Sequence, residues 1–193
     1  MNAAGHEAGA VVTPIQLFRL AGAAAIAGGA LRALAALELL DDPVTLEWLY
    51  ASIDVLLLFG LIGIYLARAS RLGFLGLASF AVAVAALSFI GGPDADPFGF
   101  STYQEGATVL AIAMVGFSIA WFRVRERPLG APAFWFTSVV IAGALGSLPE
   151  PWPHTGIITA GLLFGVGFVG AGVDLLRGGG SSRSGSSPDA TAR

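Results

Sequence analysis

The sequence predicts an all-α, polytopic membrane protein: a six-transmembrane-helix bundle with both termini on the cytoplasmic side (N-in/C-in). Three observations lead to this prediction. The chain of 193 residues is 55% hydrophobic and only 12% charged, whereas soluble domains carry about 25% charged residues. Six apolar stretches follow one another, each close to the roughly 20 residues that a helix needs to cross a bilayer. Basic residues occur in alternate connecting loops only.

The apolar stretches follow a small, polar segment, residues 1–13, which we expect to be a disordered tail. Prolines or charges bound each stretch, and the fifth is the shortest. Each is continuously apolar, which indicates helices, because the strands of a membrane barrel alternate in polarity. A Gly- and Ser-rich segment, residues 178–193, is predicted to be a flexible cytoplasmic tail, so the transmembrane domain covers residues 14–177. The stretches span approximately residues 15–40, 45–67, 72–91, 104–122, 132–148 and 155–176.

Arginine positions predict the orientation, because cytoplasmic loops of membrane proteins are rich in basic residues. The intervening loops carry only acidic charges, among them Asp41, Asp42 and Glu150. All basic loops fall on one face only if all six stretches span, so the charge pattern supports both the number of spans and the orientation. The basic positions that define this face are Arg19, Arg68, Arg71, Arg123, Arg125, Arg127, Arg177, Arg183 and Arg193.

Small residues recur at helical spacing in the first and last stretches. Such residues let helix backbones approach closely in lipid, and we expect them to pack helices within one bundle. A homo-oligomer or a larger membrane complex is the alternative use of these faces. The residues are Ala21, Ala25, Gly29 and Ala33 in the first stretch, and Gly156, Ala160, Gly161 and Gly165 in the sixth.

The composition excludes several kinds of chemistry. The chain has no cysteine and no lysine, which excludes disulfides, thiolate catalysis, Schiff bases and a P-loop lysine. His6 and His154 lie outside the spans and do not suit a membrane haem, and the Asp94–Asp96 pair offers too few oxygens for calcium. We expect no cofactor, no metal and no nucleic-acid partner. The wealth of alanine, glycine and arginine is typical of a GC-rich bacterial genome.

Two ionisable residues within predicted spans need an explanation, because each costs about 2.5–3.5 kcal/mol on insertion scales. Arg32 precedes Pro43, the centre of the first outer turn, by as many residues as Asp54 follows it. Antiparallel neighbours therefore place both side chains at the same depth, roughly 13–16 Å below the outer surface. We predict an Arg32–Asp54 ion pair inside the bundle. Near the end of the sixth span, Asp174 and Arg177 are also predicted to pair.

Other polar residues share the outer half of the predicted bundle. Glu47 and Tyr50 form a stripe with Asp54, and a polar pocket near the bilayer midplane would include all three together with Arg32. Tyr103 and Glu105 at the start of the fourth span, and His154 at the start of the sixth, are candidates to join it. Convergent polar groups in an apolar bundle are typical of a ligand site. The alternatives are an architectural ion pair and an interfacial aromatic belt.

These residues favour a multi-pass protein of the bacterial inner (plasma) membrane that binds or transports a small solute, lipid or ion. The alternative is an accessory or scaffolding membrane subunit without its own catalytic activity. A membrane enzyme ranks third, because few polar groups converge, and no protease motif occurs in the sequence. The expected partners are the lipid bilayer and a small-molecule ligand.

Overall fold

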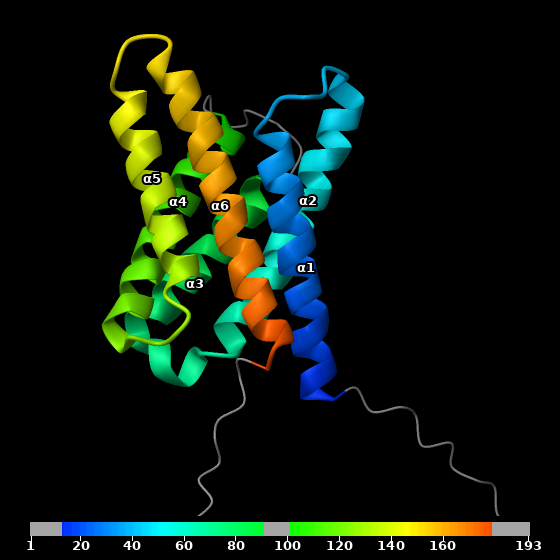
Figure 1. The fold of residues 1–193 in the computed structure, drawn as a ribbon, viewed down its shortest axis with the longest axis vertical. Helices are drawn as coiled ribbons and strands as arrows, with labels where there is room; N and C mark the ends of the chain where they lie inside the picture. The colour runs from blue at the N-terminus through cyan, green and yellow to red at the C-terminus, as the bar shows by residue number, and fades with distance from the viewer. Residues whose placement is uncertain (1–12, 91–100, 179–193) are drawn as a thin grey trace, which may run out of the picture.

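The protein is a bundle of six helices, as the sequence predicts, and a computed structural model describes residues 13–90 and 101–178. Of these residues, 85% are helical and none is in a strand. The helices run antiparallel to their neighbours in the chain, and α1 and α6 lie side by side (Figure 1). Their bounds are α1 Pro14–Ala35, α2 Pro43–Leu66, α3 Ala69–Ile90, α4 Thr102–Val124, α5 Gly130–Gly146 and α6 Trp152–Leu176.

Five of the helices are long and apolar enough to cross a membrane; α5 is apolar but has only 17 residues. At about 1.5 Å per residue, α5 is about 25 Å long, a little less than the hydrocarbon core of a bilayer. Large apolar side chains cover the outside of the bundle, including Phe74, Val55 and Ile112. A soluble monomer rarely exposes such a surface, so the bundle is that of a membrane protein.

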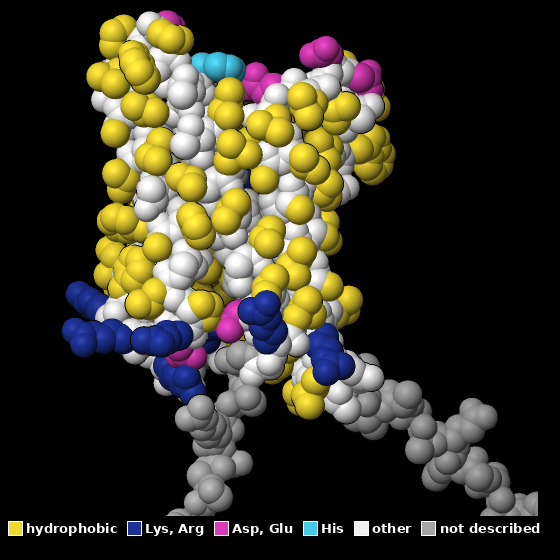
Figure 2. Space-filling model, viewed as in Figure 1, with side chains coloured by type: hydrophobic (Ala, Val, Ile, Leu, Met, Phe, Trp, Pro, Cys, Tyr) yellow, Lys and Arg dark blue, Asp and Glu magenta, His cyan; other side chains and the backbone are white. Residues whose placement is uncertain are grey.

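Charged residues divide between the two ends of the bundle. Arginines gather at the end where α1 begins and α6 finishes, which we call the arginine end (Figure 2). At the opposite, acidic end lie Glu38 and Asp42, between α1 and α2, and Glu150 and His154, around the start of α6. The side chains between the two ends are largely apolar (Figure 2).

The first helix ends at Ala35, five residues before the predicted end of its apolar stretch. Glu38 takes a left-handed conformation with φ of 50°, and Asp42 is extended before Pro43 at the start of α2. The left-handed conformation of Glu38 interrupts helical geometry. Asp42 is not helical because proline disfavours helical geometry in the residue before it. The leucines of this connection are therefore exposed, Leu39 to 73%.

Glycines bring α1 and α6 into backbone contact. A Cβ atom added to Gly29 would lie 2.5 Å from the carbonyl oxygen of Gly165, and one added to Gly165 would lie 2.3 Å from that of Gly29. Two turns away, Gly22 and Gly172 face each other in the same way. These contacts confirm that small residues of the first and sixth spans pack within the bundle.

The half of the core nearer the arginine end is filled by aromatic side chains. Phe117, Trp121 and Trp135 are completely buried, with ring centres 6.0–6.1 Å apart. Phe168 of α6 joins them at 5.0 Å from Trp135. This aromatic layer joins α4, α5 and α6 and leaves the other half of the bundle as the place for a cavity.

The predicted tails, residues 1–13 and 178–193, lie outside the described residues except for Thr13 and Gly178, and so does the Asp94–Asp96 loop. The expectations for these segments therefore remain predictions from the sequence.

Candidate functional site

A cavity of about 230 Å³ lies in the half of the bundle nearer the acidic end, and all six helices contribute to its wall. Most of the wall is apolar, and Phe164 links it to the aromatic layer through Phe168. Tyr103 and Ile157, close to the acidic end, are 44% and 62% exposed. The polar side chains on the wall are Arg32, Tyr50, Asp54, Tyr103 and Ser138.

The register of α1 and α2 sets the level of Arg32 and Asp54. Gly28 packs on Leu57, and Ala25 packs on Gly60. Continuing this antiparallel register by one helical turn brings Arg32 to the level of Asp54. The two residues therefore lie at matching depth, as the spacing about Pro43 predicts.

The predicted direct ion pair between these residues is not formed. No Arg32 nitrogen lies within 4.0 Å of an Asp54 oxygen, although the two charges attract each other across the cavity. The Arg32 guanidinium instead extends toward α6, where its Nη1 lies 3.6 Å from the Cβ position of Gly161. Gly161 has no side chain, so it leaves room for the guanidinium on that side of the cavity.

Both charged side chains of the cavity have unused hydrogen-bonding capacity. Among the described residues, neither Arg32 nor Asp54 makes a side-chain hydrogen bond or an ion pair. Tyr50 and Tyr103 lie on the same wall as these two charged residues. The four residues thus form one polar patch on an otherwise apolar wall.

The structure brings Arg32, Tyr50 and Asp54 to the cavity, but not Glu47, Glu105 or His154. Glu47 precedes Tyr50 by about one helical turn and is exposed beyond the rim. Glu105 follows Tyr103 by two positions, which turns it about 200° around α4 and away from the wall.

The histidine of α6 lies at the acidic end rather than at the cavity. His154 has its Nε2 atom 3.9 Å from a carboxylate oxygen of Glu38, and both side chains are more than half exposed. This position is at the surface of the connection between α1 and α2. Within the described ranges, no three His, Asp or Glu side chains are grouped closely enough to hold a metal ion.

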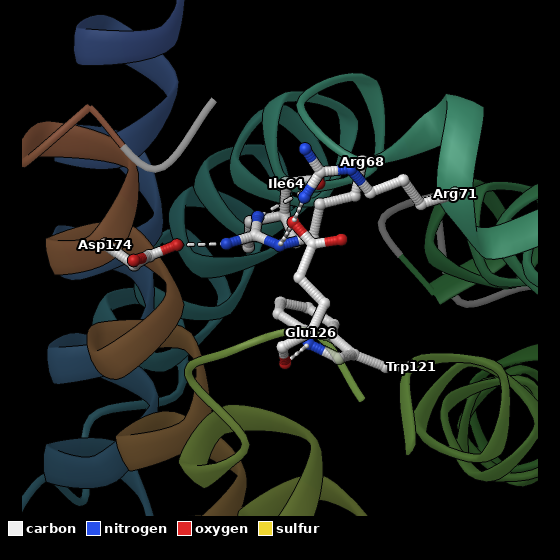
Figure 3. Close-up of polar contacts among 6 residues, drawn as sticks. All are labelled: Ile64, Arg68, Arg71, Trp121, Glu126 and Asp174. Atoms are coloured by element: carbon white, nitrogen blue, oxygen red, sulfur yellow. Dashed lines mark hydrogen bonds and ion pairs between the residues drawn. The ribbon is translucent and has the colours of Figure 1, made fainter. Parts of the chain in front are cut away.

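A second polar cluster, at the arginine end, centres on Arg68 in the turn between α2 and α3 (Figure 3). The Arg68 side chain is completely buried, and its Nη2 donates to Asp174 of α6. Its Nε lies 4.0 Å from Glu126, and its Cζ lies 4.3 Å from the ring centre of Trp121. Burial lowers the pKa of Arg68, and the negative charges of Asp174 and Glu126 oppose that shift.

Glu126 ties the α4–α5 loop into this cluster. Its carboxylate accepts a 2.7 Å hydrogen bond from Arg71, and its backbone carbonyl accepts one of 2.8 Å from Trp121 Nε1. The cluster therefore joins the α2–α3 turn, the end of α4, the α4–α5 loop and α6. It closes the arginine end of the bundle below the aromatic layer.

The predicted Asp174–Arg177 pair is wrong, because Asp174 binds Arg68 instead. A buried arginine needs a partner more than an exposed one does, since an unpaired buried charge is strongly destabilising. From the sequence, Arg68 is predicted only to be a basic residue of a cytoplasmic loop. The available signal was that Glu126 and Asp174 are the only acidic residues near the predicted basic face outside the tails.

No protein-family model matches the chain, and neither a curated protein nor a solved structure shows a detectable similarity to it. The geometry of the cavity and the Arg68 cluster is therefore the basis for a functional proposal. The cavity combines two phenols, an apolar wall and two opposite charges that have no hydrogen-bond partner within residues 13–90 and 101–178. The charges of the Arg68 cluster are paired with one another, although Arg68 Nε and Glu126 Oε2 are buried without a hydrogen-bond partner.

Proposed function

We propose that this chain is a multi-pass protein of the bacterial plasma membrane, with the arginine end in the cytoplasm, that binds a small solute in the six-helix cavity. One observation carries the proposal: the cavity is lined by all six helices and holds Arg32 and Asp54, neither of which has a hydrogen-bond or ion-pair partner in the described part of the chain. Placing charges within apolar spans costs free energy. A bound solute that pairs with them would offset part of that cost.

The side from which solute enters is part of the proposal. The Arg68 cluster and the aromatic layer fill the bundle between the cavity and the arginine end, whereas exposed cavity residues such as Tyr103 lie near the acidic end. Basic loops favour the cytoplasm. Solute therefore enters from the extracytoplasmic side in this conformation. Transport would require a second conformation in which the arginine end opens.

Cysteine labelling tests the cavity directly, because the chain has no cysteine of its own. Ala142 lines the cavity, and Ala144, two positions along the same helix, is exposed and does not line it. We expect a membrane-impermeant thiol reagent, added to intact cells, to label the Ala142→Cys variant and not the Ala144→Cys variant. Equal labelling of the two, or no labelling of Ala142→Cys, would contradict a water-filled cavity.

A second pair of variants tests the orientation. Ser147 is at the acidic end and Leu129 at the arginine end, and both are exposed. We expect Ser147→Cys to react in intact cells and Leu129→Cys to react only after permeabilisation. The binding function itself predicts that some solutes protect Ala142→Cys from the reagent. If no class of small solute does so, the accessory or scaffolding role becomes the better explanation.

A further inference from the structure

The two charged side chains of the cavity differ from the buried arginine at the other end of the bundle. Arg68 has a carboxylate, a backbone carbonyl and an indole ring around its guanidinium. Arg32 has none of these partners among the described residues, and Asp54 likewise lacks a hydrogen-bond donor. Both side chains are only partly buried, so a molecule that enters the cavity can reach them. The cavity therefore presents a cation and an anion that are both open to a ligand.

The sign of the two charges narrows the class of ligand. An anion would pair with Arg32 but be repelled by Asp54, and a cation would meet the opposite problem. A neutral molecule would leave Arg32 and Asp54 without a directly bound counter-ion in a medium of low dielectric constant, where charge interactions are strong. Only a ligand that carries both charges complements the two side chains together. No Arg32 nitrogen lies within 4.0 Å of an Asp54 oxygen, and both side chains line the cavity.

The size and wall of the cavity narrow the class further. The volume of the cavity is about 230 Å³. This is smaller than the cavities of about 300–1,000 Å³ that hold drug-sized ligands. Beside the polar patch the wall is apolar, with Leu57, Leu87, Leu110 and Phe164. A small apolar group suits this part of the cavity.

We propose that the cavity binds a small zwitterion with an apolar side group, such as an α-amino acid with an aliphatic or aromatic side chain. The carboxylate pairs with Arg32, the ammonium group pairs with Asp54, and the side group lies against the leucines and Phe164. Tyr50 and Tyr103 are placed on the wall to hydrogen-bond the charged groups. This inference rests on the proposed function, because it names the ligand class of the same cavity.

The test uses the full-length chain in lipid nanodiscs and four probes of similar shape. Leucine carries both charges, isocaproate lacks the ammonium group, isoamylamine lacks the carboxylate, and isoamyl alcohol has no charge. We expect leucine to bind at least about tenfold more tightly than each of the others in calorimetry, because each charge-assisted hydrogen bond adds to affinity. Leucine should also protect the Ala142→Cys variant from the thiol reagent at lower concentration than the other probes do.

Two variants assign the charges to the two ends of the ligand. Arg32→Gln should remove the advantage of leucine over isoamylamine, and Asp54→Asn should remove its advantage over isocaproate. Glu47→Gln, which alters an exposed carboxylate outside the cavity, is the matched control and should leave leucine binding unchanged. If either charge variant fails to fold, the four probes are still compared by how well they protect the Ala142→Cys variant from the thiol reagent. That variant keeps both Arg32 and Asp54, so the comparison still tests the zwitterion proposal.

The zwitterion proposal is overturned if any of the three analogues binds as tightly as leucine, or if none of the four probes binds. The proposed function fails separately, only if no solute of any class protects the Ala142→Cys variant. Protection by an anion alone or a cation alone would therefore keep the cavity as a binding site and reject its assignment to zwitterions.

Discussion

The guanidinium carbon of Arg68 lies 4.3 Å from the ring centre of Trp121, whose indole nitrogen donates to the backbone carbonyl of Glu126. The ring thus stabilises Arg68 through its face and fixes the α4–α5 loop through its edge. Since Asp174 binds the other end of the guanidinium, four segments depend on one buried cation.

Replacing Asp174 by asparagine should destabilise the bundle by about 2 kcal/mol. Breaking a buried pair usually costs about 3–5 kcal/mol, and the partial exposure of Asp174 reduces that cost. Arg71→Gln, which removes an exposed partner of Glu126, should cost less than about 1 kcal/mol. Equilibrium unfolding in mixed micelles measures both. Equal losses in the two variants would contradict the central role of the Arg68–Asp174 pair.

Gly165→Ala should push α1 away from α6, because the added methyl group would overlap the Gly29 carbonyl. The free energy of unfolding should fall by at least about 1–3 kcal/mol. Gly170 on the same helix has no neighbour within 4 Å of its Cβ position. Gly170→Ala should therefore be neutral or stabilising by up to about 1 kcal/mol, since alanine is the better helix former. Thermal unfolding of the two variants is the comparison, and a neutral Gly165→Ala would show that α1 and α6 are farther apart.

The start of α2 should become sensitive to acid. Hydrogen bonds from the Thr45 side chain and then its backbone N–H lower the pKa of Asp42. The stabilisation is therefore present above the ordinary aspartate pKa of about 3.9 and is lost as pH falls through the lower folded-state value. Hydrogen exchange should show weaker protection of the first turn of α2 at low pH.

The Asp42→Ala variant should reproduce this loss of protection at neutral pH, because it removes the capping carboxylate. Asp41→Ala is the control, since Asp41 makes no side-chain hydrogen bond within the described part of the chain. Similar fraying in both variants would point to charge in the loop rather than to the cap.

Filling the cavity should abolish ligand binding without unfolding the protein. Ala111 lines the cavity, and its neighbour Ile112 is 66% exposed on the outside of the bundle. Ala111→Phe should block labelling of the Ala142→Cys variant and remove leucine binding, while Ile112→Phe should change neither. Size-exclusion chromatography checks that both variants remain monodisperse. Unchanged labelling with Ala111→Phe would place the reactive thiol outside the cavity.

The helices could be predicted from the sequence because a bilayer imposes a length and a polarity on each span. The six apolar stretches match the six helices to within a few residues, except at the end of α1, where apolar composition continues through a turn. The register of Arg32 and Asp54 followed from simple counting about Pro43. Such counting works because helix rise is nearly constant and the connection between the helices is short.

The direction of individual side chains could not be predicted in this way. Whether Arg32 points to Asp54 or over Gly161 depends on which helix packs behind α1, and that is a tertiary property. The partner of Asp174 lies in a turn far away in sequence, so local spacing suggested Arg177 instead. The position of Glu105 along the fourth span predicts its depth but not the face of α4 on which it lies, so the sequence places it wrongly at the cavity.

The glycine contact between α1 and α6 has a consequence for biosynthesis. During translation, α1 enters the membrane while the four intervening helices are still to be made, and its glycine face then has no protein neighbour. Only when α6 is inserted do the carbonyls of Gly29 and Gly165 come together, and the cavity gains its sixth wall at the same moment. Assembly is therefore completed only when α6, the last helix, packs against α1, the first. A nascent chain halted before α6 would have an open groove in place of the cavity.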